Sequence, residues 1–320
     1  MSQVLKVRQR YLGRLLERLH APQLWFALGD RCGRFLPVRA DELVSLLGGT
    51  IWYVVASKER RATVRRNHDL ILRSRLGTVA LELHVLSAFV SYVRYYVDLF
   101  TTIHRAPSSL ALRTTVENAE LFWSAYEQGK GVIVVTAHLG DWDYGAYWFA
   151  QQGCEIAAVV EHLEPEELSN WFVRQRKSMG VEPIFVGPNA VAEVASRLAQ
   201  GMAVALVADR DISGTGELMD FFGERLRFPL GPALIAERTH APVVGCFVYT
   251  SRSGQRRIVF GEPSQDSSID SLRLRERVRL RTQAIVKLLE HAIERAPEQW
   301  HVFVPLEREA ASDRVSEPQE

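Results

Sequence analysis

From about residue 107 onward, short apolar runs alternate with longer amphipathic segments, and this alternation constrains the fold more than any other feature. The apolar runs are rich in β-branched residues and have the length of buried strands. They cover 132–136, 156–160, 183–186, 203–208, 242–250 and 257–261. Helices are predicted at 110–128, 165–179, 191–199, 232–239 and, as a long basic helix, 271–295. Repeated strand–helix units predict an α/β fold with a mostly parallel or mixed central sheet flanked by helices.

Residues 1–107 have a different pattern and predict a helical N-terminal region. Leucines at 12, 15, 16 and 19 recur at helical spacing, as do apolar residues between 81 and 100, and no strand-rich run interrupts them. We therefore expect a helical region over 1–107, an α/β core over 108–306 and a polar, disordered tail over 307–320.

The composition excludes several classes of protein. The chain has 39 Lys and Arg against 38 Asp and Glu, so it lacks the basic excess of a dedicated nucleic-acid binder. Its longest stretch without a charged residue, 43–57, would span about 22 Å as a helix, short of the roughly 30 Å of a bilayer core. Gly48 and Gly49 weaken that helix further. The nine histidines are scattered and the three cysteines lack CxxC spacing, so no metal site is expected.

The segment 132–145, VIVVTAHLGDWDYG, carries the residues suited to proton transfer. His138 and Asp143 would lie about 140° apart on a continuous helix, so they can meet only if His138 precedes the helix and Asp143 lies in its first turn. Gly140 would then supply the bend and Asp141 the N-cap. A carboxylate could hold one imidazole nitrogen while the other faces a cleft, as a general base requires. The simpler alternative is a histidine that only caps the strand.

These residues, taken with others, resemble the motifs of the glycerolipid and lipid A acyltransferase superfamily. The segment 138–143 resembles its His-x4-Asp/Glu motif, and the resemblance continues over roughly residues 60–305. Further similar segments follow in the family's order: Arg65-Arg66-Asn67, F-x3-R-x3-G at 172–180, ADRD at 208–211, DFFG at 220–223 and PEQW at 297–300. The DRD and DFFGE variants, Asp143 and Glu161 look most like the actinobacterial phosphatidylinositol mannoside acyltransferases.

The resemblance implies an O-acyltransferase with a glycerolipid acyltransferase-like α/β fold. His138 would remove the proton of an acceptor hydroxyl as it attacks a thioester carbonyl, with Asp143 orienting and charging the imidazole. Because the thioester is already activated, neither an acyl-enzyme nor a cofactor is expected. By the same resemblance Asp209 belongs to the catalytic group.

Three residues are expected on the substrate side. Arg176 is suited to a phosphate or to the developing oxyanion, because its charge is permanent and its fork is planar. The resemblance places Glu161 on the substrate side, and we expect Arg210 to bind substrate as well. An ionised Asp209 at the end of an apolar strand is costly unless it functions or pairs with Arg210.

The resemblance also implies partners and a location. The donor is expected to be acyl-CoA, and the acceptor a membrane glycolipid, first the mannose of phosphatidylinositol mannoside. We expect peripheral binding to the cytoplasmic face of the cell membrane, with the N-terminal region nearest an anionic surface, because the apolar run 43–57 is followed by a basic cluster. That cluster comprises Lys58, Arg60, Arg61, Arg65 and Arg66. Two alternatives stay open: a lipid A-type or lysophospholipid acyltransferase using another acceptor or acyl-ACP, and a non-catalytic peripheral membrane scaffold.

Overall fold

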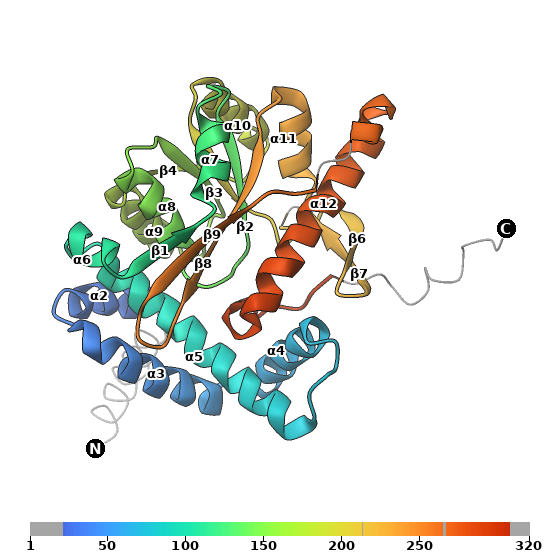
Figure 1. Ribbon diagram of the computed structural model, residues 1–320. Helices are drawn as coiled ribbons and strands as arrows, with labels where there is room; N and C mark the ends of the chain where they lie inside the picture. Colours follow the sequence, from blue (N-terminus) through green and yellow to red (C-terminus); the bar gives the residue numbers. More distant parts are fainter. Residues whose placement is uncertain (1–21, 213, 265–266, 308–320) are drawn as a thin grey trace, which may run out of the picture.

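The computed structural model describes residues 22–212, 214–264 and 267–307, and it confirms the α/β architecture (Figure 1). Seven strands form one sheet in the order β1-β9-β8-β2-β5-β3-β4. All neighbours in it run parallel except the antiparallel pair β8 and β9. The strands are β1 (Thr114–Glu117), β2 (Val132–Thr136), β3 (Ile156–Val160), β4 (Val181–Phe185), β5 (Ala203–Val207), β8 (Val243–Thr250) and β9 (Arg256–Gly261). An antiparallel hairpin, β6 (Glu217–Phe221) and β7 (Glu224–Phe228), forms a second small sheet.

Helices cover both faces of the large sheet, which explains why its central strands are apolar throughout. All five residues of β2 are buried; Ile133 and Val135 belong to the core on one face, Val132 and Val134 to the core on the other. On the first face lie α10 (Ala190–Ala199), α11 (Gly231–Thr239), α12 (Leu274–Arg295) and the hairpin. On the second lie α7 (Ala119–Tyr126), α8 (Trp142–Gln151) and α9 (Glu166–Ser178).

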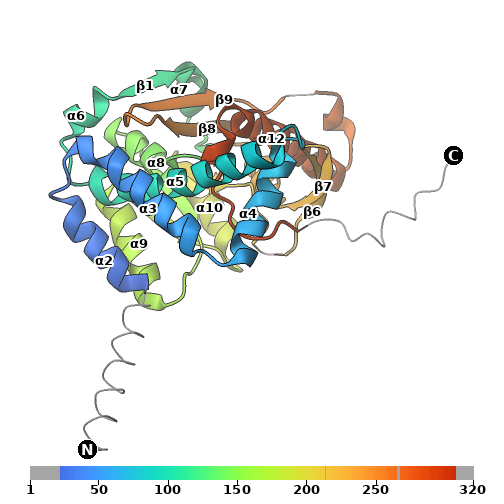
Figure 2. The ribbon, with the colours of Figure 1, turned by 90° about the horizontal axis from the view of Figure 1, so that it is seen from below.

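The described part of the N-terminal region is helical, as predicted. It comprises α2 (Pro22–Gly33), η1 (Val38–Ala40), α3 (Asp41–Val55), α4 (Lys58–Ile71) and α5 (Thr78–Thr102). Helix α5 packs on the sheet, where Tyr95 and Leu99 enter the core, and α3 lies on the outer side of α5 (Figures 1 and 2). Helix α3 is continuous through Gly48 and Gly49, contrary to the expected weakness. A Cβ at Gly49 would overlap the backbone of Val90 in α5, so the glycine allows the two helices to approach closely.

Two parts of the fold differ from the sequence-based prediction. The helix predicted at 110–128 is instead α6 (Pro107–Ala111), the edge strand β1 and α7. The hairpin β6–β7 was not predicted. No helix in the described ranges is long and apolar enough to cross a membrane. The leucines at 12–19 and the tail from residue 308 lie outside those ranges.

Candidate active site

His138 lies in the loop between β2 and α8, where the sequence places it. The preceding residues form β2, and Asp141 caps α8 by accepting a hydrogen bond of 3.3 Å from a backbone N–H of its first turn, which also contains Asp143. The turn between them depends on Gly140, which has φ +59°. A Cβ at Gly140 would overlap the carbonyl oxygen of Val248, so only glycine brings the loop this close to β8.

The carboxylate that holds His138 is that of Asp209, and the predicted pairing with Asp143 is wrong. Nδ1 of His138 lies 2.8 Å from Oδ1 of Asp209, and the backbone N–H of His138 donates to Oδ2 at 2.9 Å. Strands β2 and β5 are parallel neighbours in which Thr136 pairs with Val207. Each of the two functional residues therefore stands two positions beyond the paired ends of its strand, at the carboxyl edge where sites of open α/β sheets form.

A third residue completes this arrangement. The indole N–H of Trp300 donates to Oδ2 of Asp209 at 2.8 Å. Burial by itself raises the pKa of Asp209, but the charge of His138 and the hydrogen bonds from His138 and Trp300 outweigh it and lower that pKa below its usual value. Asp209 is therefore an ionised acceptor. It keeps the proton of the neutral imidazole on Nδ1 and leaves Nε2 as the basic nitrogen.

The imidazole of His138 remains accessible to a substrate. Its side chain keeps 21% of its surface exposed, whereas the Asp209 side chain is fully buried. The ring of Trp142 meets the imidazole edge-on at 5.4 Å and forms one wall beside it. A buried carboxylate behind a partly exposed imidazole is the arrangement that a general base requires.

Asp143 instead supports that aromatic wall. It forms an ion pair with Arg176, with Nε–Oδ1 at 2.8 Å and Nη2–Oδ2 at 3.3 Å, and accepts a hydrogen bond of 2.6 Å from the hydroxyl of Tyr95. The Tyr95 ring stacks on Trp142 at 3.9 Å. Arg176 is thus the partner of a buried carboxylate, and two of its nitrogens are committed there rather than to a phosphate or an oxyanion.

Glu161 and Arg210 lie near each other, each about one third exposed, with their charged groups 3.9 Å apart. Asp209 pairs with His138 and not with Arg210. Arg210 and Asp209 both line a cavity of about 190 Å³, whose wall is completed by the β6–β7 hairpin and residues 304–307. The position of Arg210 at this cavity is compatible with substrate binding, which stays a prediction for both residues.

The PEQW segment closes the site, a role that sequence reasoning did not assign to it. The Gln299 side chain accepts from the backbone N–H of Thr250 at 2.9 Å and donates to its carbonyl oxygen at 3.1 Å. The backbone carbonyl oxygen of Gln299 accepts from the N–H of Gly140 at 2.9 Å. The N–H of His301 then donates to the carbonyl oxygen of His138 at 2.7 Å. The segment therefore holds the loop that carries His138, while Trp300 holds Asp209.

Two buried histidines lie next to this segment. His301 stacks on Tyr92 at 4.7 Å, and its Nε2 lies 2.9 Å from the hydroxyl of Ser91. Burial, and then the neighbouring His68 and His138, lower the pKa of His301 well below its ordinary value. Burial also lowers the pKa of His68 to about 3. Both imidazoles are therefore neutral in the folded protein.

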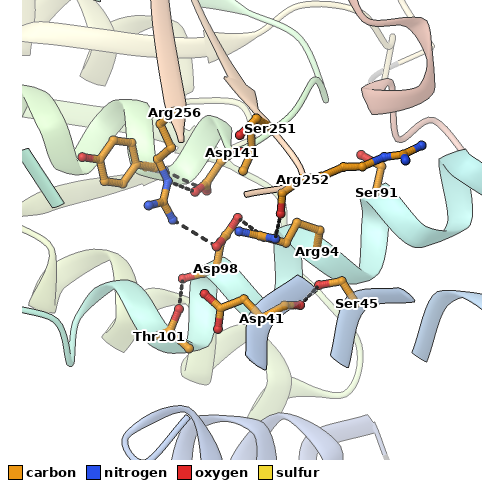
Figure 3. A network of polar contacts seen from close by, with 12 residues as sticks. Asp41, Ser45, Ser91, Arg94, Asp98, Thr101, Asp141, Ser251, Arg252 and Arg256 are labelled. Carbon is orange, nitrogen blue, oxygen red and sulfur yellow. Dashed lines mark hydrogen bonds and ion pairs between the residues drawn. The ribbon is translucent and has the colours of Figure 1, made fainter. Parts of the chain in front are cut away.

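A buried network of charges fixes the N-cap of α8 (Figure 3). Nε of Arg256 donates to Asp141 at 2.9 Å, and its Nη2 lies 3.2 Å from Asp98, which also pairs with Arg94 at 3.1 Å. Burial raises the pKa of Asp141 to about 7, and Arg256 opposes that rise. Two cations and two anions compensate one another here and connect α5 and β9 to the turn that carries His138. Sequence reasoning missed the network because its members are far apart along the chain.

The sequence is similar to those of known proteins over most of its length. Residues 17–308 match the family described as bacterial lipid A biosynthesis acyltransferase. The chain is 31% identical over 224 residues to a phosphatidylinositol mannoside acyltransferase of Mycolicibacterium smegmatis, covering 69% of this chain and 71% of the relative. It is also 31% identical over 220 residues to the protein of that name in Mycobacterium tuberculosis, covering 67% of each chain.

Proposed function

The chain belongs to the bacterial lipid A biosynthesis acyltransferase family and is an acyltransferase, and from this premise we propose that it moves a long-chain fatty acyl group from acyl-CoA to a hydroxyl of a membrane glycolipid. The preferred acceptor is the mannose of a phosphatidylinositol mannoside, the lipid that names its two mycobacterial relatives. The observation that carries the proposal is the set of contacts that join His138, Asp209 and Trp300. They supply one oriented base at the edge of the sheet, which is what direct transfer between an alcohol and a thioester needs.

The reaction uses His138 first as a base and then as an acid. The acceptor hydroxyl gives its proton to Nε2 of His138 while its oxygen attacks the thioester carbonyl carbon. The ionised carboxylate of Asp209 stabilises the imidazolium that forms, the role predicted for Asp143. The tetrahedral intermediate then expels the sulfur by breaking the C–S bond, and Nε2 returns the proton to that sulfur. The products are an ester and the free thiol of coenzyme A.

A basic groove supports acyl-CoA as the donor. It lies between the β6–β7 hairpin and the start of α12, and five arginines line it, at 225, 227, 273, 275 and 279. Among the described residues, its acidic lining is Glu217 and Glu276. Arg227 also lines the cavity that reaches Asp209, so groove and cavity adjoin. Guanidinium groups match phosphates in charge and in geometry, and the nucleotide of CoA carries three phosphate groups. Within the groove Arg275 pairs with Glu217 and Arg227 with Glu307. Farther along α12, Arg277 and Arg281 pair with Glu237.

A panel of donors and acceptors tests the proposed activity. Purified protein is incubated with palmitoyl-CoA or palmitoyl-ACP and with phosphatidylinositol mannoside, a lysophospholipid or a lipid A precursor, and the products are identified by mass spectrometry. We expect an acyl ester of the mannolipid and free CoA. Selective use of another acceptor or of the ACP donor would replace the proposal with the lipid A-type or lysophospholipid alternative. No acyl product from any pair would favour the scaffold.

The groove has its own test. Replacing Arg225 and Arg279 together by alanine should raise the KM for palmitoyl-CoA by roughly tenfold or more, because each charge-assisted contact is worth about 1.5–3 kcal/mol. The KM for palmitoyl-pantetheine, which lacks the nucleotide, should not change. Arg238→Ala, at an exposed arginine of α11 outside the groove, is the matched control. An equal rise in the KM for both donors would show that the groove does not bind the nucleotide of CoA.

A donor and an acceptor of these kinds meet at a membrane surface. We infer that the protein works as a peripheral protein on the cytoplasmic face of the cell membrane, since acyl-CoA is water-soluble and the acceptor is anchored by its acyl chains. This location is measured by fractionating cells and asking whether alkaline carbonate releases the protein from the membrane. Release supports peripheral binding, whereas retention would contradict it.

A further inference from the structure

Helix α3 packs on α5 with one face, and its outward face is also apolar and is covered by no described residue. Seven large aliphatic side chains on it are between 39% and 72% exposed, and they extend over roughly half of the helix circumference. They are Leu43, Val44, Leu46, Leu47, Ile51, Val54 and Val55, which we call the α3 ridge. The polar residues among them are Glu42 and Thr50. A helix on the surface of a water-soluble protein normally turns polar residues outward, so the α3 ridge needs an apolar partner.

The ridge is not required for packing inside the protein. The opposite side of α3 carries the contacts with α5: Gly49 lies against Val90, and the ring of Trp52 meets Phe89 at 5.0 Å. Two further exposed apolar residues, Val79 and Leu83, lie at the start of α5 and are 75% and 61% exposed. Figure 1 shows α3 along the outer edge of the molecule, with α5 between it and the sheet.

Unpaired cations border one end of the ridge. Of the five basic residues in the cluster at 58–66, two are used internally. Arg61 donates to three carbonyl oxygens at the end of α3, and Arg65 pairs with Glu82 at 3.2 Å. Lys58, Arg60 and Arg66 have no acidic partner among the described residues, and all three are exposed. The exposed acid beside them is Glu59.

We propose that the α3 ridge inserts into one leaflet of a membrane, with α3 parallel to the surface and Lys58, Arg60 and Arg66 against anionic headgroups. An apolar ridge bordered by cations fits an interfacial helix, in which acyl chains cover the aliphatic side chains and lipid phosphates neutralise the charges. This inference rests on the proposed function to the extent that a lipid acceptor requires contact with a membrane.

Aromatic contacts connect the ridge to the catalytic loop. Trp52 on the inner side of α3 lies 5.6 Å from the ring of Tyr92, and Tyr92 stacks on His301. His301 in turn donates its N–H to the carbonyl oxygen of His138. A membrane held by α3 would therefore lie a few side chains from the base that acts on the lipid acceptor.

Vesicle binding by the full chain tests the inference. We compare sedimentation with vesicles of phosphatidylcholine and of phosphatidylcholine mixed with phosphatidylinositol. Leu47→Asp combined with Ile51→Asp should lower partitioning by roughly tenfold or more, since two large aliphatic side chains are lost from the inserted face. Leu280→Asp, at a 40% exposed leucine of α12, is the matched control and should bind like the wild type. Lys58→Gln with Arg60→Gln should lose the preference for anionic vesicles.

A soluble acceptor separates this inference from the proposed function. With short-chain acyl-CoA and methyl mannoside, the α3 variants should keep the wild-type rate, while their rate on vesicle-embedded mannolipid falls together with binding. Vesicle binding unchanged by the α3 substitutions would overturn the inference and leave the function intact. A wild-type dimer that the substitutions dissociate, with no binding to vesicles, would overturn it in favour of a second copy. Ridge-dependent vesicle binding without acylation of either acceptor would uphold the inference and refute the function.

Discussion

Replacement of Asp209 by asparagine isolates the charge that holds His138. The substitution preserves the shape of the side chain but replaces an ionised acceptor with a neutral amide. Asp209 faces three donors, Nδ1 and the backbone N–H of His138 and the indole N–H of Trp300. Whichever way the amide is turned, its NH2 group meets at least one of these donors, and no negative charge is left to stabilise the imidazolium.

The magnitude follows from the burial of this pair. Removing one partner of a buried, hydrogen-bonded charge pair costs about 3–5 kcal/mol, and Asp209 is that partner for the imidazolium that forms when His138 takes up the hydroxyl proton. That energy corresponds to a fall in kcat of roughly 10²–10⁴. Stability should change less, by about 1–3 kcal/mol, because the ground-state loss is that of hydrogen bonds to a carboxylate.

The assay measures kcat with saturating acyl-CoA and acceptor, together with the unfolding midpoint in urea. Asp143→Asn is the matched comparison. It leaves the buried guanidinium of Arg176 without its ionised partner, so it should reduce stability by about 3–5 kcal/mol and affect kcat less in the fraction that stays folded. If Asp209→Asn kept kcat within tenfold of wild type while Asp143→Asn abolished it in folded protein, the assignment of the orienting carboxylate would be refuted.

Three other predictions concern stability. Gly49→Val should lower the unfolding free energy measured in urea by about 3 kcal/mol, because its side chain would overlap α5. Gly77→Ala, with no atom near its Cβ position, should cost no more than about 1 kcal/mol, the loss expected for alanine at the N-cap of α5. His68 has a pKa near 6.5 in the unfolded chain and about 3 in the folded protein, so the unfolded chain binds a proton that the folded protein does not. The unfolding free energy should therefore decrease as the pH falls below 6.5, by about 2 kcal/mol at pH 5. His68→Gln should flatten this pH dependence. Arg256→Met should lower the unfolding free energy at neutral pH by about 3–5 kcal/mol, because Asp141 and a second buried carboxylate lose their cation; a change below 1 kcal/mol would contradict the network.

The strands that the sequence predicted well are those buried on both faces. Strand β2 is buried at every position, so it reads as one apolar run. The edge strand β1 has the sequence TTVE, with three of its four residues exposed, and no hydrophobic pattern distinguishes it from the helices around it. The hairpin was missed for a similar reason, since charged residues alternate with its buried ones.

The histidine could be identified from local sequence, but its partner could not. Five-residue spacing made Asp143 the obvious candidate, and the placement of both residues around the start of α8 was correct. The carboxylate that reaches His138 lies 71 residues away and is brought there by the pairing of β2 with β5. The resemblance placed Asp209 in the catalytic group but not against His138. That contact follows from the strand order, and the order of parallel strands depends on crossover connections that no local pattern records.

Several of the resembling segments have positions in the structure that explain their residue types. Asn67, from the Arg-Arg-Asn segment, donates from its side chain to the carbonyl oxygens of Val302 and Val304, just after Trp300. Phe221 of the DFFG segment packs against Trp300, and the N–H of Phe222 donates to Glu290. Asn67 and Phe221 therefore hold the chain around Trp300, a role that sequence alone could not assign to them.

We propose that His138 is the base in the direct transfer of an acyl group from acyl-CoA to a lipid hydroxyl. The most direct test of this proposal compares purified wild-type protein with His138→Ala, each given palmitoyl-CoA and phosphatidylinositol mannoside, with the acylated lipid quantified by mass spectrometry. We expect an acylated mannolipid and an equal amount of free CoA from the wild type, and no product above background from the folded variant. Acylated product from His138→Ala at the wild-type rate would contradict it.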